Sequence, residues 1–405
     1  IYPLVYYYIA YGDQNLHRKE NTEQANCYMT MYVTLGENAA ADGCFPHRTE
    51  DYIVLKSLAE EYHLAMAYYY LGCLLYDRRV YDESIEDYEE SILRSPDFPT
   101  VHRNLALAYY NVKKLPQRAY EEMEKAFALD ETDARVYLEL DQLKKRLNVA
   151  VKERWSDMEK HFDLVESRDD LYLEYVTLLN TLGEPEKALG LIKARKFHQW
   201  EGGEGKVAAQ YLTALYQLAK AAVEKEDYAE AKELLLRAVG EYPHNLGEGK
   251  LESGQENNLY YLLGLVQEKL GEAKDAFESL TRACCGESEP VGMMYYNDQP
   301  PEMIYYQGLA YRMLGEEEQA VRRFQKLVDY GREHIRDDVK IDYFAVSLPD
   351  LLIFEENLNE RNRKHCLFMM SLGLKGLGRI DEAEKCAEEL LAMDNAHQEI
   401  RVHDL

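Results

Sequence analysis

A helical pattern of 34 residues recurs along this chain, and the copy between Ala65 and Phe98 is nearly complete. The landmark residues of this copy, in order, are Tyr68, Leu71, Gly72, Leu75, Ser84, Tyr88, Ser91 and Pro96. Small residues at Gly72 and Ser84 let two helices approach each other, and Pro96 ends the second helix because proline lacks an amide donor. One helix pair cannot bury its apolar face alone, so this pattern predicts a stack of such pairs.

Worn or complete copies of the pattern occur along the rest of the chain. Including an eroded copy at 6–35, the spacing predicts nine helix pairs. The unit that begins near Thr132 keeps Tyr137 and Leu140, but its second helix, around 155–162, fits the pattern poorly. Landmarks of the later copies are Leu182, Ala219, Gly264, Gly308 and Ser371. We therefore expect an all-α fold, a right-handed superhelical solenoid of stacked antiparallel helix pairs.

Insertions divide this solenoid into parts. We expect a degenerate N-terminal repeat or cap (1–64), regular repeats (65–168), repeats with inserted loops (169–362), and a C-terminal repeat and cap (363–405). The four inserted loops are predicted at 196–206, 243–256, 284–302 and 330–362. Equivalent loops of a stacked array leave it at the same edge. The four loops are therefore expected to form one surface.

Composition excludes some partners. The net charge is −27, from 74 acidic against 47 basic residues, so nucleic acid and anionic membrane surfaces are poor partners. No stretch has the apolar length needed to cross a membrane. Seven cysteines, an odd number without a CxxC motif, favour reduced thiols and a cytoplasmic location. The first residue is Ile1 and no charged leader follows it, so we expect the chain to begin inside a larger protein.

The string Gly-Glu-Gly-Lys occurs twice, at 203–206 and 247–250, at the same point of adjacent units. It is not a phosphate-binding loop, because Val207 and Leu251 follow the lysines where Ser or Thr is required. A lysine in the first turn of a helix opposes the helix dipole and favours a pairing partner. One interpretation is an ion-paired helix start at which the two loops brace each other. The other is a polar pocket with Trp200 as a stacking wall.

The inserted loops carry the candidate ligand-binding residues, which combine aromatic rings with planar polar groups. These residues are His198, Trp200, Glu201, Glu204, Lys206, Asn245, Glu248, Lys250, Gln255, Glu256, Asp298, Gln299, Glu302 and Tyr343. No His-Glu-x-x-His motif, clustered Cys/His set or Gly-x-Ser-x-Gly elbow is present. We expect no metal and no cofactor. Catalytic residues are unknown, and enzymatic activity is left open.

The landmarks resemble the tetratricopeptide repeat, whose pattern places Trp-Leu-Gly-Tyr-Ala-Phe-Ala-Pro at these positions. Longer strings at 197–206, 245–251, 297–303 and 340–350 resemble the C-terminal helical region of a family of large bacterial tetratricopeptide proteins. Gln199 stands where that family has Pro. The family carries a preceding domain that resembles the galactose-mutarotase β-sandwich. This resemblance implies carbohydrate handling by the whole protein and assigns no catalytic residue.

Two functions follow as hypotheses. The first is a scaffold of a larger bacterial protein that binds a protein or peptide partner, or its own missing domain, through the solenoid and the inserted loops. The cations of a carboxylate clamp are largely missing at the first-helix positions, which hold Tyr69, Cys73, Asn104, Arg135 and Glu139. A basic or neutral partner is therefore favoured over an acidic tail. The alternative is a carbohydrate-binding or glycan-processing protein whose sugar site combines the inserted loops with the missing domain.

Overall fold

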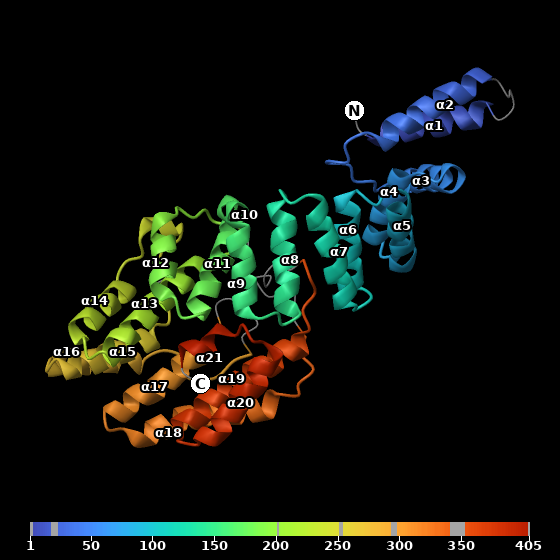
Figure 1. The fold of residues 1–405 in the computed structure, drawn as a ribbon. Helices are drawn as coiled ribbons and strands as arrows, with labels where there is room; N and C mark the ends of the chain where they lie inside the picture. Colours follow the sequence, from blue (N-terminus) through green and yellow to red (C-terminus); the bar gives the residue numbers. More distant parts are fainter. Residues whose placement is uncertain are drawn as a thin grey trace. The chain divides into compact units, whose positions relative to one another are not determined.

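The computed structural model describes residues 3–17, 23–200, 202–250, 254–292, 298–340 and 353–403, apart from the side chains of 13–29. Every secondary-structure element in these ranges is a helix, which confirms the all-α prediction (Figure 1). The chain forms two compact units. Unit 1 comprises Ile1–Leu143 and Ile353–Glu355, and unit 2 comprises Lys144–Leu352 and Glu356–Leu405.

The helices of unit 1 follow the predicted pairs, with one additional helix before the first complete repeat. They are α1 (Pro3–His17), α2 (Glu23–Glu37), α3 (Thr49–Tyr62), α4 (Ala65–Asp77), α5 (Tyr81–Arg94), α6 (Pro99–Asn111), α7 (Pro116–Leu129) and α8 (Ala134–Arg146), whose last turn lies in unit 2. Helices α6 and α7 each begin with proline, which fits the first turn because its missing donor is not needed there.

Small residues bring α4 and α5 together as the pattern predicted. A Cβ atom on Gly72 would lie 2.7 Å from the ring of Tyr88, so any larger residue would push the helices apart. The hydroxyl of Ser84 donates to the Gly72 carbonyl at 2.7 Å, and that of Ser91 donates to the Ala65 carbonyl at 2.8 Å. Both buried serine hydroxyls therefore have a hydrogen-bond acceptor on the facing helix.

One acidic group of α5 opposes folding at neutral pH. Burial, and then the charges of Glu83 and Glu86, raise the pKa of Asp87 to about 7. Its folded pKa lies above the ordinary value, so its ionisation destabilises unit 1 increasingly as the pH rises from about 4 to about 7. Asp87→Asn is expected to stabilise the protein by about 1–2 kcal/mol at pH 8, after allowance for partial solvent exposure, and to have little effect at pH 4.

Urea denaturation at the two pH values measures this difference. The matched control is Asp97→Asn, which changes an exposed carboxylate just beyond the same helix. An equal effect of Asp87→Asn at both pH values would contradict the explanation.

Unit 2 has longer connections between its helix pairs. Its helices are α9 (Val151–Lys160), α10 (Phe162–Ser167), α11 (Asp169–Thr181), α12 (Pro185–Ala194), α13 (Lys206–Glu224), α14 (Tyr228–Val239), η1 (His244–Leu246), α15 (Asn257–Lys269), α16 (Ala273–Ala283), α17 (Pro301–Met313), α18 (Glu317–His334), α19 (Leu358–Gly376), α20 (Ile380–Met393) and α21 (Gln398–Val402). The pairs α11–α12, α13–α14, α15–α16, α17–α18 and α19–α20 match the later copies of the pattern. We call the first helix of each pair an A helix.

The poorly fitting second helix is in fact two short helices, α9 and α10, with a break at His161. A buried ion pair joins this region to α11: a guanidinium nitrogen of Arg154, whose side chain is 0% exposed, lies 2.7 Å from a carboxylate oxygen of Glu174. Lys145 lies 3.3 Å from the same carboxylate. Charge pairing therefore replaces the small-residue packing that the regular repeats use.

A short piece of the fourth inserted region belongs to unit 1. The ring of Phe354 is fully buried and packs edge-on against Tyr110, with 5.1 Å between the ring centroids. The Asn111 side chain donates to the Ile353 carbonyl at 2.9 Å and accepts from the Glu355 amide at 2.8 Å. We call 353–355 the α6 strap, because it lies along the end of α6.

Two further observations bear on the sequence predictions. None of the helices in the described ranges combines the length and the apolar character that a bilayer span requires. The cysteines whose side chains the structure describes form no disulfide with one another.

Candidate functional site

The first two inserted loops brace each other through Glu248. Its carboxylate accepts hydrogen bonds from the backbone amides of Gly205 at 2.7 Å and Ala208 at 2.8 Å, at the beginning of α13. The first amides of a helix lack partners within the helix, and a negative charge there is favoured by the helix dipole. Glu248 thus caps a helix that belongs to the neighbouring unit. The bracing interpretation describes this contact, although the bond is from carboxylate to backbone and not from lysine to glutamate.

The second lysine of the doubled motif does not open a helix, because the next helix, α15, begins only at Asn257. Lys250 instead donates to the carbonyl of Val239, the last residue of α14, at 2.6 Å. It also lies 2.8 Å from the Glu256 carboxylate. A cation at a helix C-terminus satisfies an unpaired carbonyl and the dipole together. The first lysine, Lys206, is the first residue of α13, as predicted.

Asparagine side chains form hydrogen bonds with the C-terminal ends of three helices, at the points where inserted loops begin. Asn245 donates to the carbonyls of Ile192 and Arg195 at the end of α12, at 2.8 and 2.9 Å. Asn257 donates to the carbonyl of Ala283, the last residue of α16. Asn362 donates to the carbonyl of His334, the last residue of α18. Of these three asparagines, only Asn245 is among the predicted ligand-binding residues. Asn257 is the first residue of α15 and Asn362 lies near the start of α19, so an Asn at the beginning of an A helix was the available signal for these two.

The remaining candidate residues are placed as follows. His198 bonds to Asp169 through its amide at 2.8 Å and its ring at 3.0 Å. The indole of Trp200 lies against Gly203, where a Cβ atom would meet it at 2.2 Å. The Gln299 side chain donates to a backbone carbonyl of its own loop at 2.6 Å. Glu204 is exposed and Asp298 is half-buried, while Glu201 and Tyr343 lie outside the described residues.

Contacts therefore join the first loop to the second, and the second to the third, where Gln255 closely approaches Gly286. Four of the predicted ligand-binding residues, Asn245, Glu248, Lys250 and Gln299, hydrogen-bond to backbone groups of the loops and helices. A shared sugar pocket remains a prediction.

A second candidate site lies on the A helices of unit 2, where the C-terminal segment 398–403 packs across them. We call this segment the tail, and the surface under it the A-helix face. The tail side chains Ile400, Val402 and His403 are 1%, 4% and 3% exposed. In Figure 1 the tail helix α21 lies beside α17 and α19. Such burial of a five-residue helix requires close packing by its surroundings.

Hydrogen bonds fix both ends of the tail to the A helices. The Gln398 side chain donates to the Thr177 carbonyl of α11 at 3.2 Å and accepts from Gln210 of α13 at 3.0 Å. At the other end, Lys220 of α13 donates to the Val402 carbonyl at 2.8 Å. Lys375 of α19 similarly donates to the His403 carbonyl at 3.1 Å. The A-helix face therefore recognises backbone carbonyls as well as side chains.

The His403 ring ends the tail inside a buried polar cluster. One ring nitrogen lies 2.9 Å from the hydroxyl of Tyr306, which in turn lies 2.6 Å from the hydroxyl of Tyr216. The other ring nitrogen lies 3.2 Å from Glu399. Burial, and then the charge of Glu399, raise the pKa of the nearby Glu302 to about 8. Of the residues in this cluster, only Glu302 is among the predicted ligand-binding residues, because nothing in the repeat pattern indicates that the tail is buried.

The A helices of unit 1 show why a carboxylate clamp is missing. Glu139 is fully buried, and Arg103 donates to both of its carboxylate oxygens at 2.6 Å. Arg135 adds a third contact at 3.1 Å. Both arginines are therefore already paired with a carboxylate of the chain itself.

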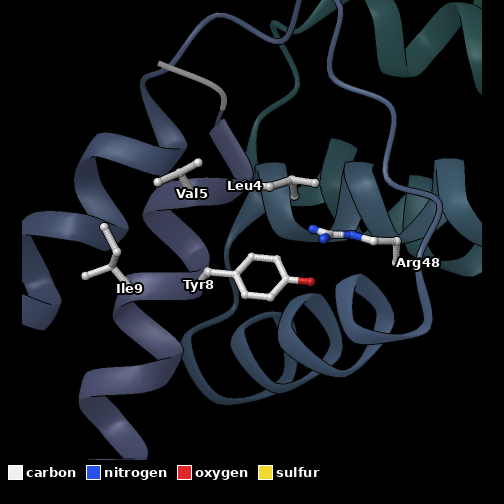
Figure 2. A pocket seen from close by; sticks show the side chains of 5 residues that line it. All are labelled: Leu4, Val5, Tyr8, Ile9 and Arg48. Atoms are coloured by element: carbon white, nitrogen blue, oxygen red, sulfur yellow. The ribbon is translucent and has the colours of Figure 1, made fainter.

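Unit 1 also has a surface hollow of about 310 Å³ near the start of α1, lined by Leu4, Val5, Tyr8, Ile9 and Arg48 (Figure 2). Its two polar groups already have a partner, since the Tyr8 hydroxyl donates to Asp51 at 2.6 Å and Arg48 pairs with Asp51 at 3.2 Å. The hollow therefore offers mainly apolar contact.

Comparison with known families agrees with the repeat pattern. Residues 69–134 and 216–290 match one family model described as tetratricopeptide repeat, and residues 302–330 match a second with the same description. The chain contains tetratricopeptide repeats, and it is a scaffold of the class that mediates protein interactions.

The chain also has low similarity to several solved structures. Naa15/Naa10 bound to HypK-THB is 9% identical, with a TM-score of 0.40, over 97% of this chain. This chain spans only 58% of that chain. YrrB, a TPR protein with an unusual peptide-binding site, is 15% identical over 56% of this chain and 89% of its own, with a TM-score of 0.20. PilF of Pseudomonas aeruginosa is 15% identical over 66% and 91%, with a TM-score of 0.22.

Proposed function

We propose that the A-helix face of unit 2 binds a short peptide segment of a protein partner, and that the tail occupies this face until the partner displaces it. The observation that supports this proposal is the seating of the tail on α11, α13, α17 and α19 through side-chain and backbone contacts together. A tethered segment has a high effective concentration, so it competes strongly with a free peptide of equal intrinsic affinity.

The contacts of the tail describe the peptide that would fit. Ile400 and Val402 supply two buried β-branched side chains, and Gln398 and His403 supply hydrogen bonds at either end. Lys220 and Lys375 meet carbonyl oxygens. A partner segment with the pattern Gln-x-Ile-x-Val-His, or a close variant, reproduces every one of these contacts.

A labelled peptide with the sequence of Asp394–Leu405 tests the proposal in the full chain. Ile400→Asp with Val402→Asp places two charges in apolar surroundings and should release the tail. The peptide is expected to bind this double variant at least about tenfold more tightly than the unmodified protein, by fluorescence anisotropy, because the tethered competitor is gone. Arg401→Gln changes an exposed side chain of the same segment, so this variant should bind the peptide as weakly as the unmodified protein does.

Two outcomes would contradict the proposal. The first is equal peptide affinity for the unmodified protein and the double variant. The second is a cooperative loss of helicity in the double variant by circular dichroism, which would make the tail a fixed part of the core.

The carbohydrate function and the preceding β-sandwich implied by the family resemblance stay predictions, as does the cytoplasmic location. Trp200→Ala is expected to remove glycan binding by the complete protein without loss of helicity, if the inserted loops form a sugar site. Calorimetric titration of the complete protein with a glycan would measure this. Unchanged sugar affinity in Trp200→Ala would rule out the composite loop site.

A further inference from the structure

Three potential metal ligands from two separate elements meet under the tail. Glu302 lies in the first turn of α17, whereas Glu399 and His403 lie one turn apart in the tail. One carboxylate oxygen of each glutamate and one ring nitrogen of the histidine all lie within 4.8 Å of one another. Metal–oxygen and metal–nitrogen bonds of about 2.0–2.2 Å need their ligand atoms about 3–4 Å apart, so only small side-chain movements would complete a site.

Glu302 is a buried carboxylate without a lysine or arginine partner in the described part of the chain. Its side chain is 8% exposed, and among the described residues no lysine or arginine forms an ion pair with it. A buried carboxylate needs a compensating charge or a proton, and here a second carboxylate, Glu399, lies beside it. The neighbouring glutamates of the inserted loops are different, because Glu248 caps a helix and Glu256 pairs with Lys250. A cation between Glu302 and Glu399 would compensate for the cost of burying the Glu302 charge and would remove the repulsion between the two carboxylates.

The histidine is oriented for this role by a second hydrogen bond. Its Nδ1 faces the Tyr306 hydroxyl at 2.9 Å, which leaves Nε2 directed at Glu399, 3.2 Å away. Metal-bound histidines usually hold their other ring nitrogen in such a bond, which fixes the tautomer and the ring plane. The Glu399 side chain is 39% exposed, so this side of the cluster is open to water and to an entering ion.

We propose that Glu302, Glu399 and His403 bind one divalent transition-metal ion of the Zn²⁺ class, which fastens the tail to α17. Two carboxylates and an imidazole suit Zn²⁺ and its neighbours, whereas Mg²⁺ and Ca²⁺ prefer oxygen ligands alone. A water molecule would complete a tetrahedral shell. The proposal does not depend on peptide binding at the A-helix face, because the three ligands form the site whatever the tail's role.

The test is calorimetric titration of the chelator-treated full chain with ZnCl₂, together with Co²⁺ absorption spectroscopy. We expect one equivalent of Zn²⁺ to bind, and Co²⁺ to give the visible absorption of a tetrahedral site without the intense thiolate band that cysteine ligands produce. Glu302→Gln and His403→Gln should each weaken Zn²⁺ binding at least about tenfold. His63→Asn, which removes an exposed histidine of unit 1, should bind Zn²⁺ like the unmodified protein.

Two results would overturn the metal site: the absence of a one-to-one Zn²⁺ complex, or unchanged Zn²⁺ affinity in Glu302→Gln. If His403→Gln fails to fold, Glu399→Gln replaces it, since that side chain is partly exposed. A thermal shift gives a second readout. Zn²⁺ should raise the melting temperature of the unmodified protein but not that of Glu302→Gln, and equal shifts in both would count against the site. Peptide titrations carried out in chelator keep this test separate from that of the A-helix face.

Discussion

Glu174→Leu is expected to lower the free energy of unfolding by about 3–5 kcal/mol, because it removes a carboxylate that pairs with the buried guanidinium of Arg154. The Arg154 side chain is 0% exposed and that of Glu174 is 22% exposed, so water cannot replace this carboxylate at the guanidinium. The charges of Lys145 and Arg154 outweigh burial and hold the pKa of Glu174 well below its usual range. Urea denaturation followed by circular dichroism measures the loss.

The double variant Arg154→Met with Glu174→Leu separates pairing from packing. Replacing both charges by apolar groups should recover much of the lost stability, since the desolvation cost of the ions is removed together with their attraction. Glu317→Gln is the control, because it breaks an exposed ion pair with Arg312 and should give no measurable change. A loss of stability in the double variant as large as in Glu174→Leu would show that shape, and not charge, determines this junction.

Gly373→Ala is expected to destabilise the protein by about 1–3 kcal/mol or more, because it overpacks the contact between α18 and α19. A Cβ atom at Gly373 would lie 2.5 Å from the carbonyl oxygen of Phe324 and 2.7 Å from a methyl group of Val328. The obstructing oxygen belongs to the backbone and cannot rotate away, so the two helices must separate. Urea denaturation again gives the measurement.

Gly190→Ala is a matched control for this change. Gly190 lies inside α12, and a Cβ atom there would meet nothing within 4 Å. Alanine should therefore stabilise the protein by about 0.5–1 kcal/mol, through helix propensity alone. The packing argument predicts opposite signs for the two substitutions. A loss of stability in both, or in neither, would be incompatible with it.

The packing within each helix pair could be predicted from the sequence, because it depends on short-range periodicity. Gly72, Ser84 and Ser91 stand at positions that repeat, so their close packing and hydrogen bonds could be expected from spacing. The junction at α9 and α10 was marked as irregular, but its ion pair was not foreseen. Arg154 and Glu174 look like surface residues of two helices in the sequence, and only the packing of α9 on α11 buries the arginine.

The candidate sites were predicted in part. The doubled Gly-Glu-Gly-Lys motif indicated that two loops interact, but not that Glu248 would cap the backbone of α13 while Lys250 caps α14. The tail was missed entirely, because a helix of five residues has too little periodicity to reveal a buried face. Its contacts also join residues as far apart as Gln398 and Thr177, a pairing that a repeat pattern does not contain.

The α6 strap changes how this chain can acquire its structure. In a purely linear array each unit depends only on its neighbours, so folding can follow synthesis step by step. Here the carbonyl of Ile353 completes the surroundings of Asn111, 242 residues earlier in the chain. Closing a loop of that length delays the contact. The end of α6 therefore stays exposed to solvent during synthesis until Phe354 has been translated. Although the repeats are stabilised mainly by local contacts, unit 1 reaches its final structure only when the α6 strap binds to α6.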